Sequence, residues 1–490
     1  MRKSEPNGPS LLLSSMLLPE FSDGGYRVGL FDVSVAEEGG SAVYTASLRI
    51  TRQEHALLLR EFSRLESRNP APPELPNNLG ELIAWLTAYT APGLAAPSGR
   101  AVELAELLSY EYVGLSRLMP LIKDGKVDEV YLDSPREMPY GDHREFGRCV
   151  FPVQLAPREL EAIRTHAEIY GGESASLRTP SIKSELIVGE LRMRVGIDVP
   201  PLSPAGMAFH VRKVGAAAPT LAYLVRNGTL AEATASYMVA MASCGVNLTI
   251  IGPSGSGKTT LLNALDMALD PSLRRIYVED AIESLDLHRY GYRQTKLRVP
   301  PLEAGGEVPT SKQAEVLKAL HRSPDLLILG EIQDEGHSRA LFQALASGIV
   351  GLQTFHASGP EQAVRRWTEL HGIKRSQLED LGLIVTMRRP NPLSSRRVLE
   401  RVSEIDGQGG VRDTCSGSAE PAFPVGSALA RRVDQLRGKG ALLRSYESAR
   451  ARLRRCVSMH ADEPERFVLG FFGGVEDVCE NTQHMRPSWR

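Results

Sequence analysis

A short loop near the middle of the chain has the residue types that hold phosphate groups. The stretch GPSGSGKTT occupies residues 252–260, with Gly252 and Gly257 at the two ends of the loop. Glycine lets backbone N–H groups turn inward around an anion. Lys258 can reach the outer phosphate oxygens, and the Thr259 hydroxyl can bind Mg²⁺. The motif therefore predicts a nucleotide and Mg²⁺ site formed by Gly252, Pro253, Ser254, Gly255, Ser256, Gly257, Lys258, Thr259 and Thr260.

Hydrolysis of a bound nucleotide also needs an acid that orders the metal shell and a base that orients water. The apolar run DLLILGE ends at Glu331, and RRIYVEDAIE places Glu279, Asp280 and Glu283 after another apolar run. TFHA places His356 at the end of a third. Open α/β sheets bind ligands at the carboxyl ends of their strands, so we expect these side chains to face the loop. Two alternatives stay open: the acids cap a helix N-terminus, and the histidine is structural.

The elements that must position these groups follow a repeating pattern. Between residues 231 and 405, the short apolar runs NLTIIG, RRIYVED, DLLILGE, VGLQTFHA and LGLIVTM alternate with helix-length segments. This alternation predicts a mostly parallel sheet covered by helices. One apolar run precedes the glycine loop and a helix pattern follows it, so the dipole of that helix would add to phosphate binding.

The chain has 490 residues, too many for a single core, which predicts several domains. Prolines at positions 70, 72, 73 and 76 interrupt the front end. Farther on, VDEVYLD, ELRMRVGIDV and GMAFHVRKV are typical of strands, and 156–172 has the pattern of an amphipathic helix that ends at glycines. We expect a variable region, a smaller α+β domain, a linker with a short helix, the α/β domain and a C-terminal extension, over residues 1–100, 101–213, 214–230, 231–405 and 406–490.

Composition places the chain among ordinary globular proteins. Apolar residues make up 42% and charged residues 24%, and the net charge is −2, so the chain as a whole is no polycation that binds nucleic acid. Its five cysteines lie scattered without a CxxC pair, which indicates neither a zinc site nor a disulfide framework and favours a reducing cytoplasm. Because there is no run of 18 apolar residues, we expect no membrane-spanning helix.

Two further segments have open interpretations. SLLLSSMLLP at 10–19 is short and lacks a small-residue cleavage site, so a local apolar contact or a partner-binding segment is favoured over a signal peptide. Residues 431–455 hold nine Lys or Arg and two acids, a net charge of +7. This segment is either a solvated basic helix or a contact for anionic lipid or an acidic partner.

The order of the motifs resembles that of the secretion ATPases of type II and type IV systems, which drive pilus and archaellum assembly, protein secretion and conjugation. GPSGSGKTT, VEDAIE, SPDLLILGEI and TFHA follow one another, with Arg366 ten residues beyond His356. Upstream, RMRVGIDVPPLSPAGMAFHVRK resembles the end of the family's N-terminal domain, so the resemblance covers about 105–405. The motifs are most similar to those of archaeal members. The resemblance implies a RecA-like P-loop NTPase domain with a mostly parallel sheet, preceded by a smaller α+β N-terminal domain.

The resemblance also implies an ATP hydrolase that uses ATP and Mg²⁺, with assigned roles. Glu283 would be the general base, and Glu331 would hold the Mg²⁺ shell through water. Lys258 and Thr259 would bind phosphate and metal, and His356 would sense the γ-phosphate. Cations that close the site around the charged transition state would be the family arginines Arg194, Arg212 and Arg366.

Family resemblance further implies partners and a location. It implies a homohexameric ring that acts in the cytoplasm at the inner face of the cell membrane, with a polytopic membrane platform protein as its load. Each ATP-dependent closure of the two domains would then move a neighbouring subunit. Nucleic acid is not an expected partner, and anionic lipid is a candidate only for the basic segment 431–455.

Two departures from the family pattern support alternatives. Gln333 stands where the family usually has arginine, and Gly348-Ile349 stands where it often has Gly-His. These changes are the support for a second hypothesis, a regulatory nucleotide-binding subunit with impaired hydrolysis. A third hypothesis is a DNA-transfer or other nucleic-acid motor with the same core, which would need a basic or aromatic-lined channel.

Overall fold

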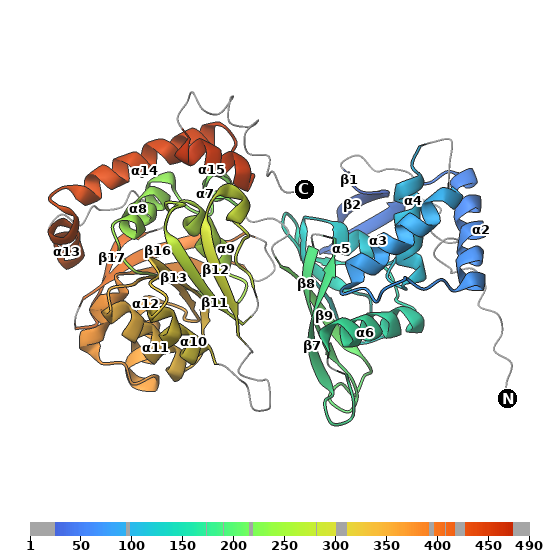
Figure 1. Cartoon of the computed structure of the whole chain (residues 1–490), viewed down its shortest axis with the longest axis horizontal. Helices are drawn as coiled ribbons and strands as arrows, with labels where there is room; N and C mark the ends of the chain where they lie inside the picture. The colour runs from blue at the N-terminus through green and yellow to red at the C-terminus, as the bar shows by residue number, and fades with distance from the viewer. Residues whose placement is uncertain are drawn as a thin grey trace. The chain divides into compact units, whose positions relative to one another are not determined.

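The computed structural model describes residues 25–94, 99–172, 174–189, 191–214, 219–280, 282–299, 311–391, 396–406, 408–416 and 427–473 (Figure 1). The apolar segment 10–19 therefore lies outside the described residues. The chain divides into two compact units between residues 216 and 217. No described helix combines the length and the apolar composition that crossing a bilayer requires.

In the N-terminal unit, nine strands of the described residues form one sheet in the order β1-β2-β3-β6-β5-β4-β9-β8-β7. Neighbours are antiparallel except β3 and β6, which run parallel. The strands are β1 (Tyr26–Val28), β2 (Phe31–Glu38), β3 (Ser41–Leu48), β4 (Val127–Leu132), β5 (Tyr140–His143), β6 (Gly147–Val150), β7 (Ser181–Val188), β8 (Leu191–Asp198) and β9 (Ala208–Val214).

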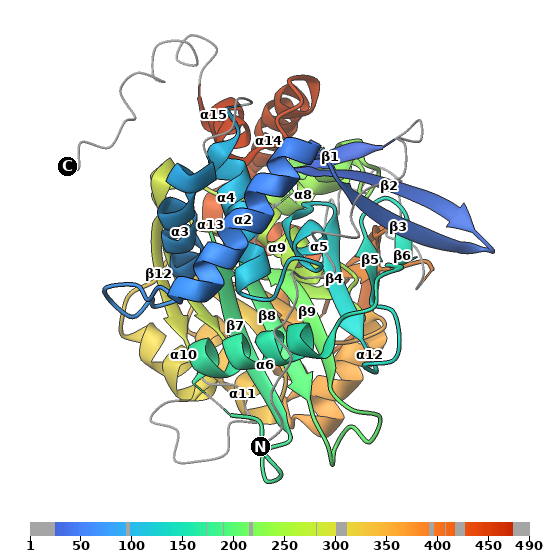
Figure 2. The ribbon, with the colours of Figure 1, turned by 90° about the vertical axis from the view of Figure 1, so that its right-hand side faces the viewer.

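Helices pack on this sheet, and α6 crosses in front of β7, β8 and β9 in Figure 2. They are α2 (Arg52–Arg68), α3 (Leu79–Thr90), the 3₁₀ turn η1 (Ala91–Leu94), α4 (Ala101–Tyr112), α5 (Met119–Lys123) and α6 (Pro157–Gly171). Local sequence sets the ends: Thr51 and Glu54 form a capping box at the start of α2. Gly172, in the left-handed conformation, ends α6.

Residues 25–94 share the sheet and the apolar core with the region after residue 100, which the sequence predicts as a separate domain. Strands β1–β3 occupy one edge of the sheet. A single buried cluster runs from Val28 through Leu65 and Leu104 to Val211. The compact unit thus extends across the boundary expected near residue 100, because β3 pairs with β6, a strand about a hundred residues farther along the chain.

In the C-terminal unit, eight strands of the described residues form a second sheet in the order β12-β11-β13-β14-β10-β15-β16-β17. The first six are parallel to one another, β16 is antiparallel to β15, and β17 is antiparallel to β16. They are β10 (Leu248–Ile251), β11 (Arg274–Glu279), β12 (Arg293–Arg298), β13 (Leu326–Ile332), β14 (Val350–Phe355), β15 (Leu383–Arg388), β16 (Val398–Ile405) and β17 (Val411–Ser416).

This sheet confirms the expected α/β fold class with a mostly parallel sheet. All five apolar runs noted above are strands, namely β10, β11, β13, β14 and β15. Residues 411–416, which the sequence analysis places in the C-terminal extension, form β17, an edge strand of this sheet whose partner is β16. Its sequence VRDTCS is mostly polar because only one side of an edge strand near solvent needs apolar residues.

Helices cover both faces of the second sheet. They are α7 (Leu221–Arg226), α8 (Glu232–Ser243), α9 (Lys258–Met267), η2 (His288–Tyr290), α10 (Lys312–Leu320), α11 (Glu335–Ala346), α12 (Pro360–Arg365), the π-helical turn η3 (Arg366–Leu370), η4 (Arg375–Leu381), α13 (Ala428–Arg437), α14 (Ala441–Ser458) and α15 (Pro464–Phe472). Alternate strand residues face opposite layers: Ile250 packs with α8 and α9, whereas Ile251 packs with α10 and α11.

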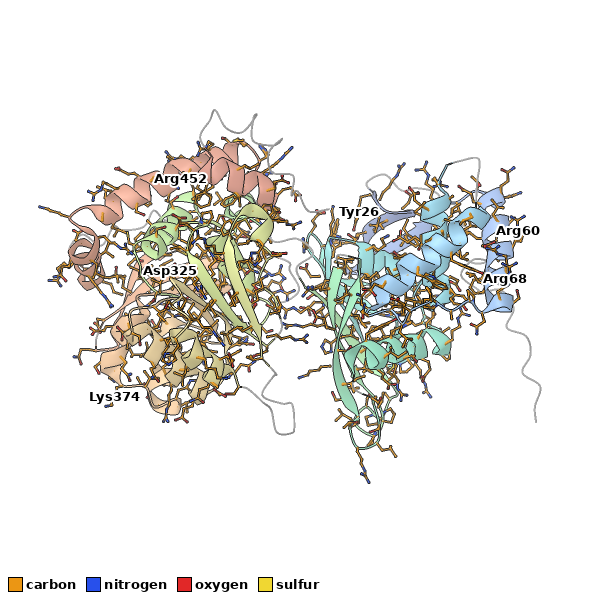
Figure 3. The ribbon with its side chains drawn as sticks, in the orientation of Figure 1. Tyr26, Arg60, Arg68, Asp325, Lys374 and Arg452 are labelled. Atoms are coloured by element: carbon orange, nitrogen blue, oxygen red, sulfur yellow. The ribbon has the colours of Figure 1, made fainter. Side chains whose placement is uncertain are left out.

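The basic C-terminal segment is part of this second unit. Helix α14 buries Leu442, Tyr446, Ala449, Leu453 and Cys456, a helical stripe that faces the core. That stripe covers α8, whose residues 233–242 are all buried. The opposite side of α14 is exposed and mostly polar, as the labelled Arg452 illustrates in Figure 3.

Candidate active site

The glycine loop connects β10 to α9 with a backbone that only glycine adopts readily. Gly252, Gly255 and Gly257 have φ values of 154°, 70° and 91°, all in the region that other residues avoid. A Cβ atom on Gly252 would lie 2.4 Å from the carbonyl oxygen of Met387 on the neighbouring strand. The sequence pattern of the loop is therefore required by its conformation.

Two polar side chains of the loop fit a phosphate ligand. Lys258 is only 8% exposed, and its Nζ lies 3.1 Å and 3.0 Å from the carbonyl oxygens of Gly252 and Pro253. The buried Ser256 hydroxyl has no hydrogen-bond partner in the described part of the chain. A buried polar group without a partner is costly, and phosphate oxygens at the loop would supply one.

Lys258 also meets the two strand-end residues predicted to join it. Its Nζ is 3.3 Å from Nδ1 of His356, which follows β14. The other ring nitrogen, Nε2, contacts the carboxylate of Glu331 on β13. The structure thus brings Lys258, His356 and Glu331 together at one edge of the sheet, as expected for side chains at the carboxyl ends of parallel strands.

Glu331 stays ionised in this arrangement. Burial alone would raise its pKa, but the hydrogen bond and attraction of His356 and the amide of Gln333 lower the pKa from 4.5 to about 2. Gln333 donates from Nε2 to Oε2 of Glu331 over 3.1 Å. Gln333 thus contacts the acid directly. Mg²⁺ binds one or two protein oxygens and keeps waters and phosphate oxygens as its other ligands, and the carboxylate of Glu331 and the hydroxyl of Thr259 fit this requirement.

The acidic segment after β11 is held by its own first glutamate. Glu279 is 3% exposed and accepts the backbone N–H of Glu283 at 3.1 Å, the N–H of Ser284 at 3.0 Å and the Ser284 hydroxyl at 2.6 Å. Burial raises the pKa of Glu279, and these donors oppose that shift. On the other side, Asn263 of α9 donates to the carbonyl of Glu283 over 2.9 Å. Glu279 therefore shapes the turn that carries Glu283.

Asp280, the remaining acid of this segment, forms an ion pair with Lys312, a residue that the sequence did not indicate. Its Nζ lies 2.7 Å from Asp280 and 2.8 Å from the carbonyl oxygen of Glu331, and the residue is 3% exposed. One buried cation thus joins the ends of β11 and β13. A lysine in the first turn of a helix carries no sequence signal of such a role.

Two arginines beside the phosphate loop were also missed. Arg397 donates from Nε to the carbonyl of Gly255 over 2.9 Å. Nη1 of Arg389 lies 3.6 Å from the place where a Cβ on Gly255 would be. They flank the β15–β16 connection, where the cluster of four arginines in MRRPNPLSSRR was an available signal.

The predicted arginines occupy two different settings. Arg366 donates to the carbonyl oxygen of His356, and its guanidinium lies over the ring of Phe355 at 4.6 Å. Arg194 and Arg212 lie in the N-terminal unit, directly opposite each other on β8 and β9. That row continues to Glu185 on β7 and Glu129 on β4, and Nε of Arg212 is 3.5 Å from Glu129. The approach of Arg194 and Arg212 to nucleotide stays a prediction.

Known proteins are similar to this chain over different lengths. The chain is 32% identical over 163 residues to an uncharacterised protein of Methanocaldococcus jannaschii, 33% of this chain and 58% of that protein. It covers 46% of a second protein of the same archaeon, so it spans about half the length of these relatives. The structure of the ATPase DotB of Legionella pneumophila is similar with TM-score 0.45 and 16% identity, over 78% of this chain and 90% of that one.

Two comparisons identify the family. The conjugal transfer protein TrbB of Rhizobium radiobacter is 30% identical over 239 residues, which are 46% of this chain and 68% of that protein. The profile of the family described as "Type II/IV secretion system protein" matches residues 178–409, a range that holds the phosphate loop, the acidic segment, Glu331 and His356. The chain belongs to the type II/IV secretion system protein family.

Proposed function

We propose that the chain is an ATPase that powers a type II or type IV secretion or pilus-like filament assembly machine. One observation carries the proposal: Lys258 of the phosphate loop lies 3.3 Å from His356, which in turn contacts Glu331. The groups that would bind phosphate, sense it and hold the metal shell thus converge at one sheet edge. Family membership supports the same conclusion.

The reaction would proceed on groups of this chain. Lys258 would exchange the carbonyl oxygens of Gly252 and Pro253 for the phosphate oxygens of ATP. Thr259 would hold Mg²⁺ directly and Glu331 through water; the ion would neutralise charge on the phosphates. The Glu283 carboxylate would orient the attacking water and accept its proton. Because His356 contacts both Lys258 and Glu331, loss of the γ-phosphate would alter its contacts directly.

The arginines would couple the site to movement. Arg366 would act through His356, whose carbonyl it holds. Arg194 and Arg212 would bind phosphate oxygens together, since they are cross-strand partners on β8 and β9 and the planar guanidinium fork suits a multiply charged anion. ATP would then favour a closed arrangement of the two units, and hydrolysis of the ATP would allow the units to open. In a homohexameric ring, this movement would be passed to a polytopic membrane platform protein.

A place in the cytoplasm at the inner face of the cell membrane is part of this proposal. Around the junction of α13 and α14, Leu436 is 68% exposed and Leu443 is 50% exposed. The exposed cations Arg431, Lys439 and Arg444 lie in the same segment. Basic residues around exposed leucines suit a surface of anionic lipid.

Two alternatives keep specific support. The neutral amide of Gln333 bonds to Glu331 at the position where the resemblance leads us to expect arginine, which favours a regulatory subunit with impaired hydrolysis. The relative TrbB is named for conjugal transfer, which favours a machine that moves DNA. Anisotropy of labelled single-stranded DNA with the full chain, at rising salt, separates direct DNA binding from a purely protein-handling motor.

The decisive test is Mg²⁺-dependent ATP hydrolysis by the full chain, with Glu283→Gln beside it and with anionic vesicles present or absent. We expect turnover by the parent and a loss of at least about a hundredfold in the variant, with nucleotide binding retained. Nucleotide binding without turnover, with or without vesicles, would instead support the regulatory alternative.

A further inference from the structure

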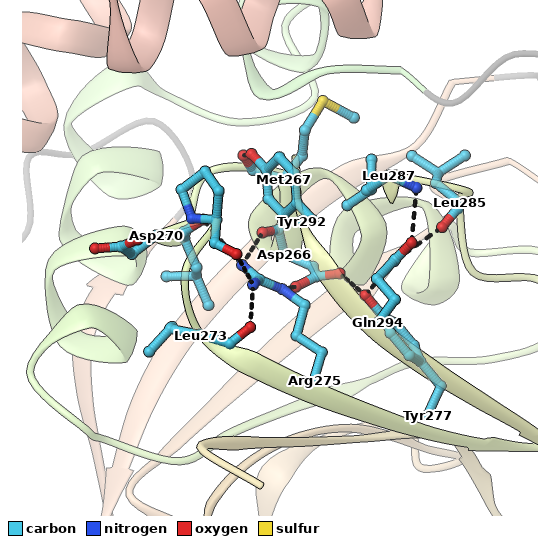
Figure 4. A network of polar contacts seen from close by, with 12 residues as sticks. Asp266, Met267, Asp270, Leu273, Arg275, Tyr277, Leu285, Leu287, Tyr292 and Gln294 are labelled. Atoms are coloured by element: carbon cyan, nitrogen blue, oxygen red, sulfur yellow. Dashed lines mark hydrogen bonds and ion pairs between the residues drawn. The ribbon is translucent and has the colours of Figure 1, made fainter. Parts of the chain in front are cut away.

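A buried polar network ties the phosphate-loop helix to the strand that precedes the acidic segment (Figure 4). Near the end of α9, the carboxylate of Asp266 accepts Nε of Arg275 at 2.8 Å and the hydroxyl of Tyr277 at 2.6 Å. Arg275 is fully buried and also donates to the carbonyls of Leu269 and Leu273, each at 2.9 Å. Asp266 and the last turn of α9 are therefore fixed to β11.

From Tyr277 the network continues to the acidic segment through one amide. Gln294 of β12 donates from Nε2 to the Tyr277 hydroxyl at 2.6 Å and to the carbonyl of Leu285 at 3.0 Å. Its Oε1 accepts the backbone N–H of Leu287 at 2.7 Å. These partners fix the orientation of the amide. In the series of hydrogen bonds from Leu287 to Asp266, each donor therefore points toward the buried carboxylate, and each bond polarises the next.

The segment is held at several consecutive points. Lys296 donates to the carbonyls of Ser284 and Leu285 at 2.9 Å and 2.7 Å. Asn263 holds the carbonyl of Glu283. Asn263 and Asp266 are three residues apart and therefore lie on the same side of α9. One helix, which begins at Lys258, is thus joined to the segment both at Glu283 and, through Tyr277 and Gln294, beyond it.

We propose that Tyr277 and Gln294 are positioning residues that fix Glu283 relative to the phosphate loop. The reason is geometric: the network ends on the backbone of the segment that carries Glu283, not on the apolar core. Its loss would leave α9 intact but free the segment to move against it, and small displacements of a reacting group have large effects on rate. This inference rests on the proposed role of Glu283 as general base.

The chain offers a matched control for this proposal. Tyr292 is also buried, at 2% exposure beside 0% for Tyr277, and its hydroxyl also reaches α9, where it donates to the carbonyl of Met267 at 2.5 Å. In the described part of the chain the Tyr292 hydroxyl does not bond to residues 283–287, and the backbone N–H of Tyr292, which donates to the carbonyl of Leu287 at 3.3 Å, is kept in Tyr292→Phe. Tyr277→Phe and Tyr292→Phe therefore each remove one buried hydroxyl bonded to the same helix, and only the first interrupts the path to the acidic segment.

The experiment compares kcat, KM and nucleotide affinity of the full chain with Tyr277→Phe, Gln294→Met and Tyr292→Phe. We expect the first two to lower kcat about tenfold or more with ADP affinity within about twofold of the parent, and Tyr292→Phe to leave kcat nearly unchanged. In the Glu283→Gln background, Tyr277→Phe should lower the residual rate no further. An equal loss of kcat in both tyrosine variants, or an unchanged effect of Tyr277→Phe without Glu283, would overturn the proposal.

Hydrogen exchange separates this inference from the proposed function. In Tyr277→Phe, but not in Tyr292→Phe, the backbone N–H groups of residues 283–287 should exchange at least about tenfold faster. If the parent chain hydrolyses no ATP, the proposed function fails, yet faster exchange would still support the tether. Unchanged exchange would overturn it regardless of activity.

Discussion

At the scale of single residues, the site is a chain of contacts in which each group sets the state of the next. Lys258 contacts His356, His356 contacts Glu331, and Gln333 takes the remaining oxygen of that carboxylate. Such a chain changes as a unit, because a phosphate that engages Lys258 removes one neighbour of His356. The charge on Glu331 and the lack of room beside Gly252 each lead to a prediction.

The first prediction concerns the stability of the fold at low pH. The pKa of Glu331 is lowered in the folded chain from 4.5 to about 2. A lowered carboxyl pKa stabilises the fold above pH 4.5, and this contribution is lost as the pH falls toward 2. The difference in urea stability between the parent and Glu331→Gln should therefore shrink steadily from pH 5 to pH 3. His356→Ala should flatten the profile in the same way, and a difference that grows in acid would contradict the assignment.

The second prediction concerns the loop backbone. Gly252→Ala would place a Cβ 2.4 Å from a backbone oxygen of β15 and 2.5 Å from Ser256 Oγ. Because a backbone oxygen cannot move aside cheaply, the loop must shift, and nucleotide affinity should fall by about tenfold or more. Gly125→Ala is the control, since its Cβ would meet nothing within 4 Å. Equal ADP affinity of both variants in calorimetry would refute this account.

At the scale of elements, α9 joins the phosphate loop to the acidic segment. It begins at Lys258, holds Glu283 through Asn263 and ends at the buried pair of Asp266 and Arg275. The phosphate loop and the acidic segment therefore share one rigid support. We therefore expect loss of the buried ion pair at the end of α9 to lower the free energy of unfolding.

Arg275→Met leaves the carboxylate of Asp266 buried without its cation, and such losses cost about 3–5 kcal/mol. Arg226→Met breaks a second arginine–aspartate pair, with Asp462, whose side chains are 33% and 34% exposed, and should cost less than about 1 kcal/mol. Chemical unfolding of the two variants tests the contrast. Similar losses would mean that the buried pair adds nothing beyond a surface one.

Sequence patterns predicted the elements of the site better than the neighbours of each element. The apolar runs that end at Glu331 and His356 predicted both strands and the edge that they share. Arg397 and Lys312 escaped, because their contacts depend on which strands lie side by side. Strand β15 follows β14 in the sequence but pairs with β10, which brings the arginines after it to the phosphate loop. Likewise, no local pattern indicates that β3 pairs with β6.

At the scale of the whole molecule, the basic C-terminal segment belongs to the core of the second unit. Leu453 of α14 is fully buried against that core, whereas Leu443 of the same helix is 50% exposed. Leu453→Ala should lower the free energy of unfolding by about 2–5 kcal/mol, and Leu443→Ala should change it by less than about 0.5 kcal/mol. Thermal unfolding of both variants is the measurement, and an equal shift would show that α14 does not seal α8.

The pairing of Arg194 with Arg212 across β8 and β9 also limits how this gene can change. Successive residues of a strand point to opposite faces, so a single inserted or deleted residue within either strand would turn one arginine away from the other. The connection between the strands, residues 199–207, has no such constraint. Length variants should therefore be tolerated between the two strands and eliminated within them, a pattern that saturation insertion mutagenesis under selection would reveal.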